Sequence, residues 1–404
     1  MKILFLSSWF PYPPDNGARI RVYNLIRHLA ARHRITLLSF VHDGQTTRDV
    51  KELASLCETI EVVPAREFRR TSLKALAGFV SSRPRWLVDV HSAEMERLVR
   101  RAQSAAATGP GYDVVIASGI KMAPYLSLLD DTPRVLEEIE TTILLDELAH
   151  AAGRIQHLRA HLRWTKFSRY IRSLLRENVD GCTVVSAPER ANLARIVPDF
   201  RPIAVVPNGV DMAYYRGFFG QPVPDTLIFN GALTYSANYD AIAYFLEKIW
   251  PRVRAQRPQA RMAITGRTRG VALDRLPPDD GVIYTGYLPD IRPCVAQSRV
   301  CVVPLRIGGG TRLKILEAMA LGTPVISTSK GAEGLDVTDG KDILLADTPG
   351  AFADGVIRLL TDDALCARLA ENGRRLVESR YDWASIGQEM EQLIRDVVKK
   401  ARSA

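Results

Sequence analysis

An α/β fold with two domains is predicted for this chain, and three observations lead to that prediction. Its 404 residues, 47% of them hydrophobic and 25% charged, are enough for two cores of ordinary size. In each half, apolar strand patterns alternate with helical ones, which is typical of parallel sheets covered by helices. Between the halves, residues 207–225 carry an Asn-Gly turn and several Pro and Gly residues, as expected of a linker.

The first half opens with a strand, a loop, a helix and a second strand. The apolar run at 2–10 predicts the first strand, PYPPDNG the loop, and 19–33 a helix whose apolar residues share one face. The second strand is expected at 35–41. The loop is rich in Pro and matches G-x-G-x-x-G poorly, which argues against dinucleotide binding.

The segment 67–101 is predicted to be helical and is rich in arginine. Its cations are interleaved with apolar residues, among them Leu73, Leu76, Phe79 and Trp86. Such a face fits an anionic membrane. It fits equally a helix with core on one side and solvent on the other, and both interpretations remain open.

The remaining elements follow from the same patterns. In the first half we expect buried strands at 112–119 and 133–140, one or two arginine-rich helices over 143–178, and a strand with a helix start over 182–190. In the second half we expect strands at 226–230, 262–266 and 282–288, a helix over 238–254, and a terminal amphipathic helix from about Arg380.

A glycine loop that opens a helix dominates the second half. An apolar run ending at Pro304 leads to the triple glycine 308–310, and a helical pattern runs from Thr311, a suitable N-cap, to Gly322. A buried strand is expected at 324–328. Such a loop presents unpaired backbone N–H groups at the positive end of the helix dipole, so it predicts an anion-binding site.

Glu317 lies two turns into this helix, among apolar neighbours. A carboxylate in such surroundings needs a partner, and a ligand hydroxyl is one candidate. The alternative is an ordinary exposed ion pair with Lys314 on the same helix face, worth about 0.2–0.5 kcal/mol. The spacing alone leaves both interpretations open.

The net charge of the chain is positive, and most of it lies in the first half. Of the net charge of +9, residues 1–210 carry +7 (29 Lys and Arg against 22 Asp and Glu), and the remainder carries +2 (25 against 23). No recognised nucleic-acid motif accompanies this bias, so no nucleic acid partner is predicted. Anionic lipid and a phosphorylated acceptor fit it equally well.

We expect a cytoplasmic protein. The five cysteines include no C-x-x-C pair, which argues against a disulfide framework or a zinc site. The strand pattern begins directly after Met1 and leaves no room for a signal peptide. No apolar run reaches the roughly 18 residues of a membrane span, so an integral membrane protein is not expected.

The block GGGTRLKILEAMALGTPV resembles the donor-binding segment of family 4 glycosyltransferases, retaining enzymes of the GT-B fold, whose usual pattern is E-x7-E followed by A-M-A-x-G-x-P-V. PNGVD at mid-chain and YDW near the end resemble further segments of that family. The resemblance implies two Rossmann-like domains facing across a cleft, with 1–207 binding the acceptor and 208–380 the nucleotide sugar. It also implies that a C-terminal helix, 381–404, crosses back to the first domain.

The resemblance also implies which residues bind the donor. Glu317 would hold the ribose of the nucleotide. The chain departs from the family pattern because the first glutamate falls at a glycine and the loop after 230 lacks the usual Arg and Lys, so other cations are needed on the diphosphate. The donor-binding candidates are Gly17, Arg21, Gly231, Arg267, Arg306, Gly309, Gly310, Thr311, Lys314 and Glu317, with Arg306 and Lys314 favoured for the diphosphate.

Acidic residues end the strand at 133–140. Ligands of open α/β sheets bind at the carboxyl ends of the strands. Glu138 and Glu140 are therefore candidates to accept the proton of an acceptor hydroxyl or to bind a sugar. A lone E-x-E is too common to predict a metal site, so neither a metal nor another cofactor is predicted.

Together these features imply an enzyme that transfers a sugar from a UDP- or GDP-sugar to a glycan or lipid-linked acceptor, with retained configuration, in cell-surface polysaccharide or glycolipid assembly. It would work in the cytoplasm, at the inner face of the membrane. Two alternatives stay open. One is a nucleotide-sugar epimerase or phosphorylase on the same fold, and the other is a non-catalytic GT-B protein that binds nucleotide or lipid.

Overall fold

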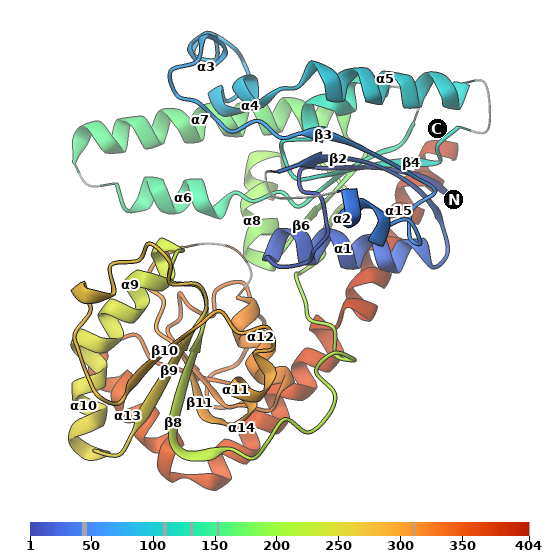
Figure 1. The fold of residues 1–404 in the computed structure, drawn as a ribbon. Helices are drawn as coiled ribbons and strands as arrows, with labels where there is room; N and C mark the ends of the chain where they lie inside the picture. Colours follow the sequence, from blue (N-terminus) through green and yellow to red (C-terminus); the bar gives the residue numbers. More distant parts are fainter. Residues whose placement is uncertain are drawn as a thin grey trace. The chain divides into compact units, whose positions relative to one another are not determined.

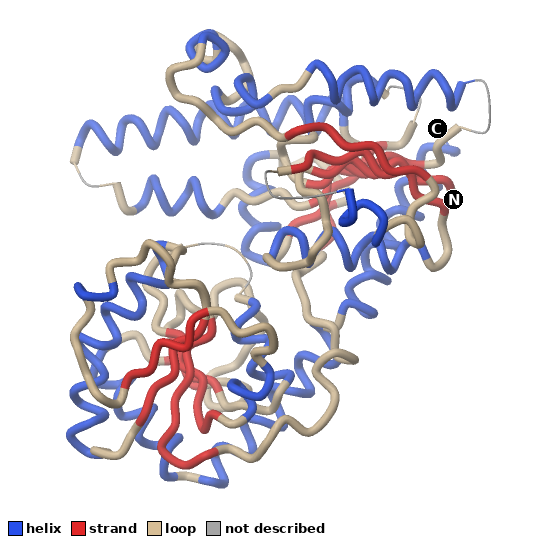
Figure 2. The backbone as a smooth tube through the Cα atoms, viewed as in Figure 1, coloured by secondary structure: helices blue, strands red, loops and turns tan. Residues whose placement is uncertain are grey.

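The computed structural model describes residues 1–42, 47–107, 111–129, 132–151, 153–308, 310 and 312–403. It divides into two compact units, Met1–Asn208 with Ile386–Ala404, and Gly209–Ser385. Each unit is a parallel sheet with helices packed around it (Figures 1 and 2). The predicted α/β fold with two sheets is therefore confirmed.

The sheet of the first unit has the strand order β3-β2-β1-β4-β5-β6-β7. Its strands are β1 (Lys2–Ser7), β2 (Arg34–Val41), β3 (Thr59–Pro64), β4 (Val114–Ser118), β5 (Arg134–Glu137), β6 (Gly181–Val184) and β7 (Ile203–Val205). The chain builds outward from β1 to β3 and then returns to the other side of β1. The carboxyl ends of β1 and β4 therefore flank the switch point at which open α/β sheets bind ligands.

Helices cover both faces of this sheet. They are α1 (Gly17–Ala30), α2 (Thr47–Glu52), α3 (Leu73–Ala77), α4 (Arg85–Val90), α5 (Ala93–Ala107), the short 3₁₀ helix η1 (Ala123–Leu128), α6 (Thr142–Ala149), α7 (Arg154–Asn178) and α8 (Ala187–Ile196). The N-cap of α1 is Asn16, whose side chain accepts a hydrogen bond from the Arg19 backbone N–H.

The last helix, α15 (Trp383–Ser403), joins the first unit from Ile386 onward. Glu391 holds it there, because this carboxylate is almost fully buried and accepts a hydrogen bond from Arg32 Nη1 at 2.8 Å. Near the other end of the helix, Arg402 Nη2 lies 2.7 Å from Asp113 Oδ1.

The second unit has the strand order β10-β9-β8-β11-β12-β13. Its strands are β8 (Val223–Asn230), β9 (Arg261–Thr265), β10 (Val282–Gly286), β11 (Ser298–Val303), β12 (Val325–Ser327) and β13 (Leu344–Leu345). The switch point lies between β8 and β11. Since every pairing described for this sheet is parallel, the loops after these two strands meet at one edge.

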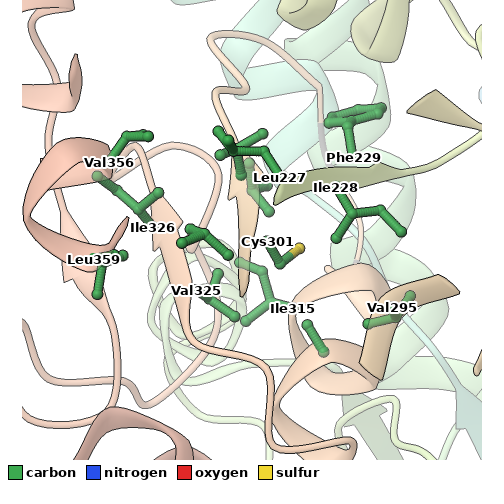
Figure 3. Packing of buried hydrophobic residues seen from close by; sticks show 14 of the residues in the cluster. Leu227, Ile228, Phe229, Val295, Cys301, Ile315, Val325, Ile326, Val356 and Leu359 are labelled. Carbon is green, nitrogen blue, oxygen red and sulfur yellow. The ribbon is translucent and has the colours of Figure 1, made fainter. Parts of the chain in front are cut away.

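The helices of the second unit are α9 (Ser236–Tyr244), the π-helical turn η2 (Phe245–Ile249), α10 (Trp250–Gln256), the 3₁₀ turn η3 (Leu273–Arg275), α11 (Arg292–Ala296), α12 (Leu313–Ala320), α13 (Pro349–Thr361), α14 (Asp363–Leu376) and the π-helical turn η4 (Val377–Tyr381). Figure 3 shows how α12 is anchored. Ile315 of α12 lies near Cys301 of β11 and Val325 of β12, and all three side chains are fully buried.

The ends of α12 agree in part with the sequence prediction. Gly322 has φ +74, its N–H bonds Met319 O, and the next N–H, of Thr323, bonds Ala318 O. This is a Schellman motif, so the predicted stop at Gly322 is confirmed. The predicted N-cap, Thr311, lies outside the described residues, and Arg312 occupies the N-cap position without a side-chain cap bond.

Candidate functional site

The switch point of the second unit gathers polar side chains from three elements. Asn230 is the last residue of β8, Lys314 and Glu317 belong to α12, and Asn238 belongs to α9. Because α12 follows β11, the helix starts at the same sheet edge at which β8 ends. This is the place where an open α/β sheet accepts a ligand.

Lys314 is held by an amide rather than by a carboxylate. Its Nζ lies 2.7 Å from Asn238 Oδ1 and 3.9 Å from the centre of the Phe229 ring. Burial of the ammonium group lowers the pKa of Lys314 to about 7. A Cβ atom on Gly231 would lie 2.8 Å from Nζ, so a glycine at this position gives the lysine its space.

Glu317 is held by two neutral groups. Its Oε2 accepts a hydrogen bond from Asn230 Nδ2 at 2.9 Å, and its Oε1 accepts one from the Tyr215 hydroxyl at 3.3 Å. Burial raises the pKa of Glu317. Neither Lys314 nor Glu317 uses the other as its partner, so the alternative of an ordinary exposed ion pair is wrong.

The glycine loop before α12 is tied to the protein by Arg312. Its Nη2 donates to Gly308 O at 2.7 Å and to Lys330 O at 3.1 Å. Gly308 and Gly310 have φ values of +99 and +84, which glycine adopts without strain. The predicted donor-binding residues Gly309 and Thr311 lie outside the described residues.

Arg306 and Arg267 occupy different surroundings. Arg306 is half exposed and pairs with Asp240 of α9, with Nη2 and Oδ1 2.6 Å apart. Arg267 is exposed and lies 5.6 Å from the centre of the Tyr287 ring. Lys314 is thus the candidate cation that shares the α12 site with Glu317, whereas the guanidinium of Arg306 is already occupied by a carboxylate.

In the first unit, Arg21 is enclosed by protein groups. It is fully buried, and its Nε and Nη2 lie 2.6 and 2.5 Å from Glu137 Oε1. Its other donors reach Val206 O, Pro207 O and Asn208 Oδ1. The predicted contact of Arg21 with the donor is corrected, because these partners use the guanidinium to hold α1, β5 and the segment after β7 together.

Glu138 follows β5 in a strained conformation. Its φ is +62, a region that non-glycine residues rarely occupy, and its N–H donates to Thr183 Oγ1 at 2.9 Å. Burial, reinforced by the charges of Glu137 and Glu140 and opposed by Arg21, raises the pKa of Glu138 to about 8. Strain and a perturbed pKa in one residue at a carboxyl edge are typical of functional positions.

The other candidates of the first unit lie at the same edge. Glu140 is partly buried and acts electrostatically on both Glu138 and Arg21. Gly17 is exposed as the first residue of α1. Ser118, which was not predicted, ends β4 and donates to Glu137 Oε2 at 2.6 Å.

Several residues of the second unit were also missed, namely Tyr215, Asn230 and Asn238. Asn230 had a usable signal, since it is a polar residue at the end of an apolar strand. The other two had none, because their role depends on the distance to α12.

In the part of the chain that the structure describes, three or more His, Cys, Asp or Glu side chains nowhere converge as a metal site would require. Nor is any described helix both long and apolar enough to span a bilayer.

Family models match both units. The model described as Glycosyltransferase Family 4 matches residues 15–214, and the model described as Glycosyl transferases group 1 matches residues 224–362. Each model covers nearly all of one of the two parallel sheets.

Curated relatives are similar to parts of the chain. It is 25% identical over 254 residues to a putative glycosyltransferase, YtcC, of Bacillus subtilis (strain 168), an alignment that covers 55% of this chain and 61% of that protein. It is 24% identical over 164 residues to an uncharacterized 44.6 kDa protein in the cps region of Klebsiella pneumoniae, which covers 39% of this chain and 42% of that protein. The chain thus spans about half the length of these relatives.

Solved structures share the fold over nearly the whole chain. Sucrose-phosphate synthase from Thermosynechococcus elongatus superposes with a TM-score of 0.68 at 19% identity, covering 99% of this chain and 100% of that one. Anabaena Alr3699/HepE in complex with UDP-glucose superposes with a TM-score of 0.61 at 17% identity, covering 98% and 100%. With a glycosyltransferase family model matched in each unit and this fold throughout, the chain belongs to the GT-B glycosyltransferases.

Proposed function

We propose that this protein transfers a sugar from a nucleotide sugar to an acceptor hydroxyl with retention of configuration. The observation that carries the proposal is the separation of Lys314 from Glu317. Each is bound to a neutral amide at the carboxyl edge of the second sheet, so a cation and a carboxylate are both available to a ligand. A nucleoside diphosphate offers the matching groups, phosphate oxygens and ribose hydroxyls.

Lys314 would bind the diphosphate. Phosphate oxygens close to Nζ would favour the charged ammonium and raise the lysine pKa from its value of about 7. The backbone of the glycine loop, with Gly310, would add N–H donors. Glu317 would accept hydrogen bonds from the ribose hydroxyls, as the family resemblance implies. Of the predicted donor-binding residues, Gly17 stays in the proposal, and so does Gly231, where a side chain would crowd Lys314 Nζ.

The reaction breaks the bond between the anomeric carbon and the diphosphate oxygen and forms a bond between that carbon and the acceptor oxygen. The proton of the acceptor hydroxyl moves to the departing phosphate oxygen, so the atoms balance without a protein nucleophile. Lys314 supplies positive charge where the leaving group gains negative charge, which is why the proposed mechanism is metal-independent. Glu138 and Glu140 would hold the acceptor at the edge of the first sheet.

The donor and pathway are part of the same proposal. The Anabaena neighbour was solved with UDP-glucose, which supports a UDP-sugar over a GDP-sugar as the first donor to test. The Klebsiella relative lies in a cps region, which supports a role in cell-surface polysaccharide assembly, with a glycan or lipid-linked acceptor in the cytoplasm.

Binding and turnover test the proposal separately. UDP and GDP are titrated into the purified protein by calorimetry, with Glu317→Gln as the variant and Glu333→Gln as a matched change of a glutamate in the same unit. We expect binding of one diphosphate that only Glu317→Gln weakens. UDP release from UDP-glucose should then require an added acceptor.

Three outcomes would overturn this function. Product formed from the nucleotide sugar alone would identify an epimerase, and sugar phosphate formed with inorganic phosphate would identify a phosphorylase. Diphosphate binding without transfer to any of a panel of glycan and lipid-linked acceptors would favour the non-catalytic alternative.

A further inference from the structure

Apolar side chains are exposed around α3. Such side chains are rarely left in water in groups, and a group of them marks an interaction surface. The exposed fractions are 86% for Leu73, 50% for Leu76, 63% for Phe79 and 93% for Val80. Helix α3 is only five residues long, and the residue that it buries is Ala75.

A second exposed group lies on α7. Ile155, Leu158 and Leu162 are 68%, 59% and 59% exposed. Their spacing of three and four residues places them on one face of the helix. The same helix buries its later apolar residues, such as Ile171 and Leu175, in the core of the first unit. The exposed face is therefore confined to the first half of α7.

The two groups adjoin. Lys166 follows Leu162 by one helical turn, and its Nζ donates to Gly78 O at 2.6 Å and lies 3.3 Å from Phe79 O. Figure 1 shows α3 beside α7 within the first unit. We call the seven exposed residues the apolar surface; they are Leu73, Leu76, Phe79, Val80, Ile155, Leu158 and Leu162.

The charge around the apolar surface is mainly positive. Residues 66–85 contain six Lys and Arg against a single acidic residue, Glu67, and residues 154–166 contain four and no acidic residue, although Arg163 pairs with Glu147 of α6. Exposed aliphatic side chains surrounded by arginines match an anionic lipid bilayer, whose head groups attract the cations while the apolar groups enter the acyl boundary. Long basic side chains can reach the head groups from such a position.

We propose that the apolar surface docks the protein on an anionic membrane. Two elements distant in sequence supply it, and both carry the same combination of aliphatic side chains and cations. Docking through α3 and α7 would hold the first unit at the bilayer surface without any membrane-spanning helix.

Vesicle flotation tests this inference without donor or acceptor, so its result does not depend on the proposed function. The full chain is mixed with vesicles of phosphatidylcholine alone or with about one third phosphatidylglycerol. The variants are Leu73→Ser with Val80→Ser, and Leu158→Ser with Leu162→Ser. Phe218→Ser is the matched control, because Phe218 is 75% exposed in the other unit.

We expect binding to the anionic vesicles that falls with added salt and that each double variant weakens at least about tenfold, whereas Phe218→Ser changes nothing. Circular dichroism melts check that the variants fold. Equal binding to neutral vesicles, or unchanged binding of both double variants, would overturn the inference. So would a self-association that the α7 variant abolishes in the absence of vesicle binding, since the apolar surface would then bind a second copy.

Discussion

The two sheets each hold a cation at the carboxyl edge, and they treat it differently. In the first unit, Arg21 is paired directly with Glu137, and its other bonds go to two backbone carbonyls and the side-chain oxygen of Asn208. In the second unit, Lys314 and Glu317 lie on one helix but contact Asn238 and Asn230 instead of each other. The pKa of Lys314 falls to about 7 as a result of burial, while that of Arg21 stays raised.

This difference distinguishes a charged side chain that stabilises the fold from one that is available to bind a ligand. A buried pair that satisfies itself holds elements together and leaves nothing for a ligand, and breaking it is costly. A cation and a carboxylate that rest on neutral amides are held in place without being neutralised. Those amides can give up their bonds to a ligand that carries the complementary charges.

Removing the cation of the first unit should have the largest effect on stability. Arg21→Met leaves the fully buried Glu137 without its cation and the carbonyl of Val206 without a donor, so we expect a loss of about 3–5 kcal/mol in the free energy of unfolding. Urea denaturation measures it. Arg100→Met in α5, where the guanidinium is mostly exposed and pairs with Glu96, should cost less than about 1 kcal/mol. A loss of similar size in both variants would contradict the contrast.

Removing the cation of the second unit should reduce binding instead. Lys314→Met deletes a charge that burial already disfavours, so the free energy of unfolding should change by no more than about 1 kcal/mol. Affinity for UDP should fall about 10- to 100-fold, since a charge-assisted bond to phosphate is lost. Calorimetry measures it. Arg306→Met removes a cation already paired with Asp240 and should leave the UDP affinity within about threefold of the original value. A larger loss in Arg306→Met would identify Arg306 as a cation that binds the diphosphate.

Space around Lys314 should matter as much as its charge. In Gly231→Ala the new Cβ lies 2.8 Å from Nζ and 2.9 Å from Asn238 Nδ2, both at the ends of flexible side chains. The protein should therefore stay folded and lose about tenfold in UDP affinity. In Gly266→Ala the Cβ meets the backbone of Ala232 at 2.6 Å with φ +107, so that variant should lose stability instead. Unchanged UDP affinity in Gly231→Ala would show that the lysine does not need this position.

The pH dependence of UDP binding should follow Lys314. The lysine is charged below its pKa of about 7 and neutral above it, so affinity should fall as pH rises from about 7 to about 9, by at most about tenfold per pH unit. The same shift makes the unfolded chain bind the extra proton between about pH 7 and the ordinary lysine pKa of 10.5, so stability should rise with pH in that window. In Lys314→Met the slope of the UDP affinity should disappear. If the UDP affinity of Lys314→Met still fell with pH, the pH dependence would belong to another titratable group.

The sequence predicted the fold better than it predicted the contacts. Most of the predicted strands and the stop at Gly322 depend on local patterns, and the structure reproduces them. The segment 67–101, predicted to be helical, is instead divided among α3, α4 and the start of α5, and strand β3 was not predicted. Arg21 was assigned to the donor because its partners, Glu137 and the segment 206–208, come from positions more than a hundred residues away. The partners of Lys314 and Glu317 were likewise invisible to spacing on a single helix. The strained backbone of Glu138 has no sequence signature at all, because glutamate seldom adopts a positive φ.

That backbone gives the smallest of the expected effects. Replacing Glu138 by glycine removes the cost of φ +62, whereas Glu138→Ala keeps it, so the glycine variant should be more stable than the alanine variant by about 1 kcal/mol. Both variants delete a carboxyl group whose pKa is raised to about 8, and both should lose transferase activity to the same extent. Thermal melts and UDP release measure the two quantities. Equal melting temperatures would mean that Thr183, which accepts the Glu138 N–H, holds the turn without strain, and retained activity in the glycine variant would remove Glu138 from the acceptor site.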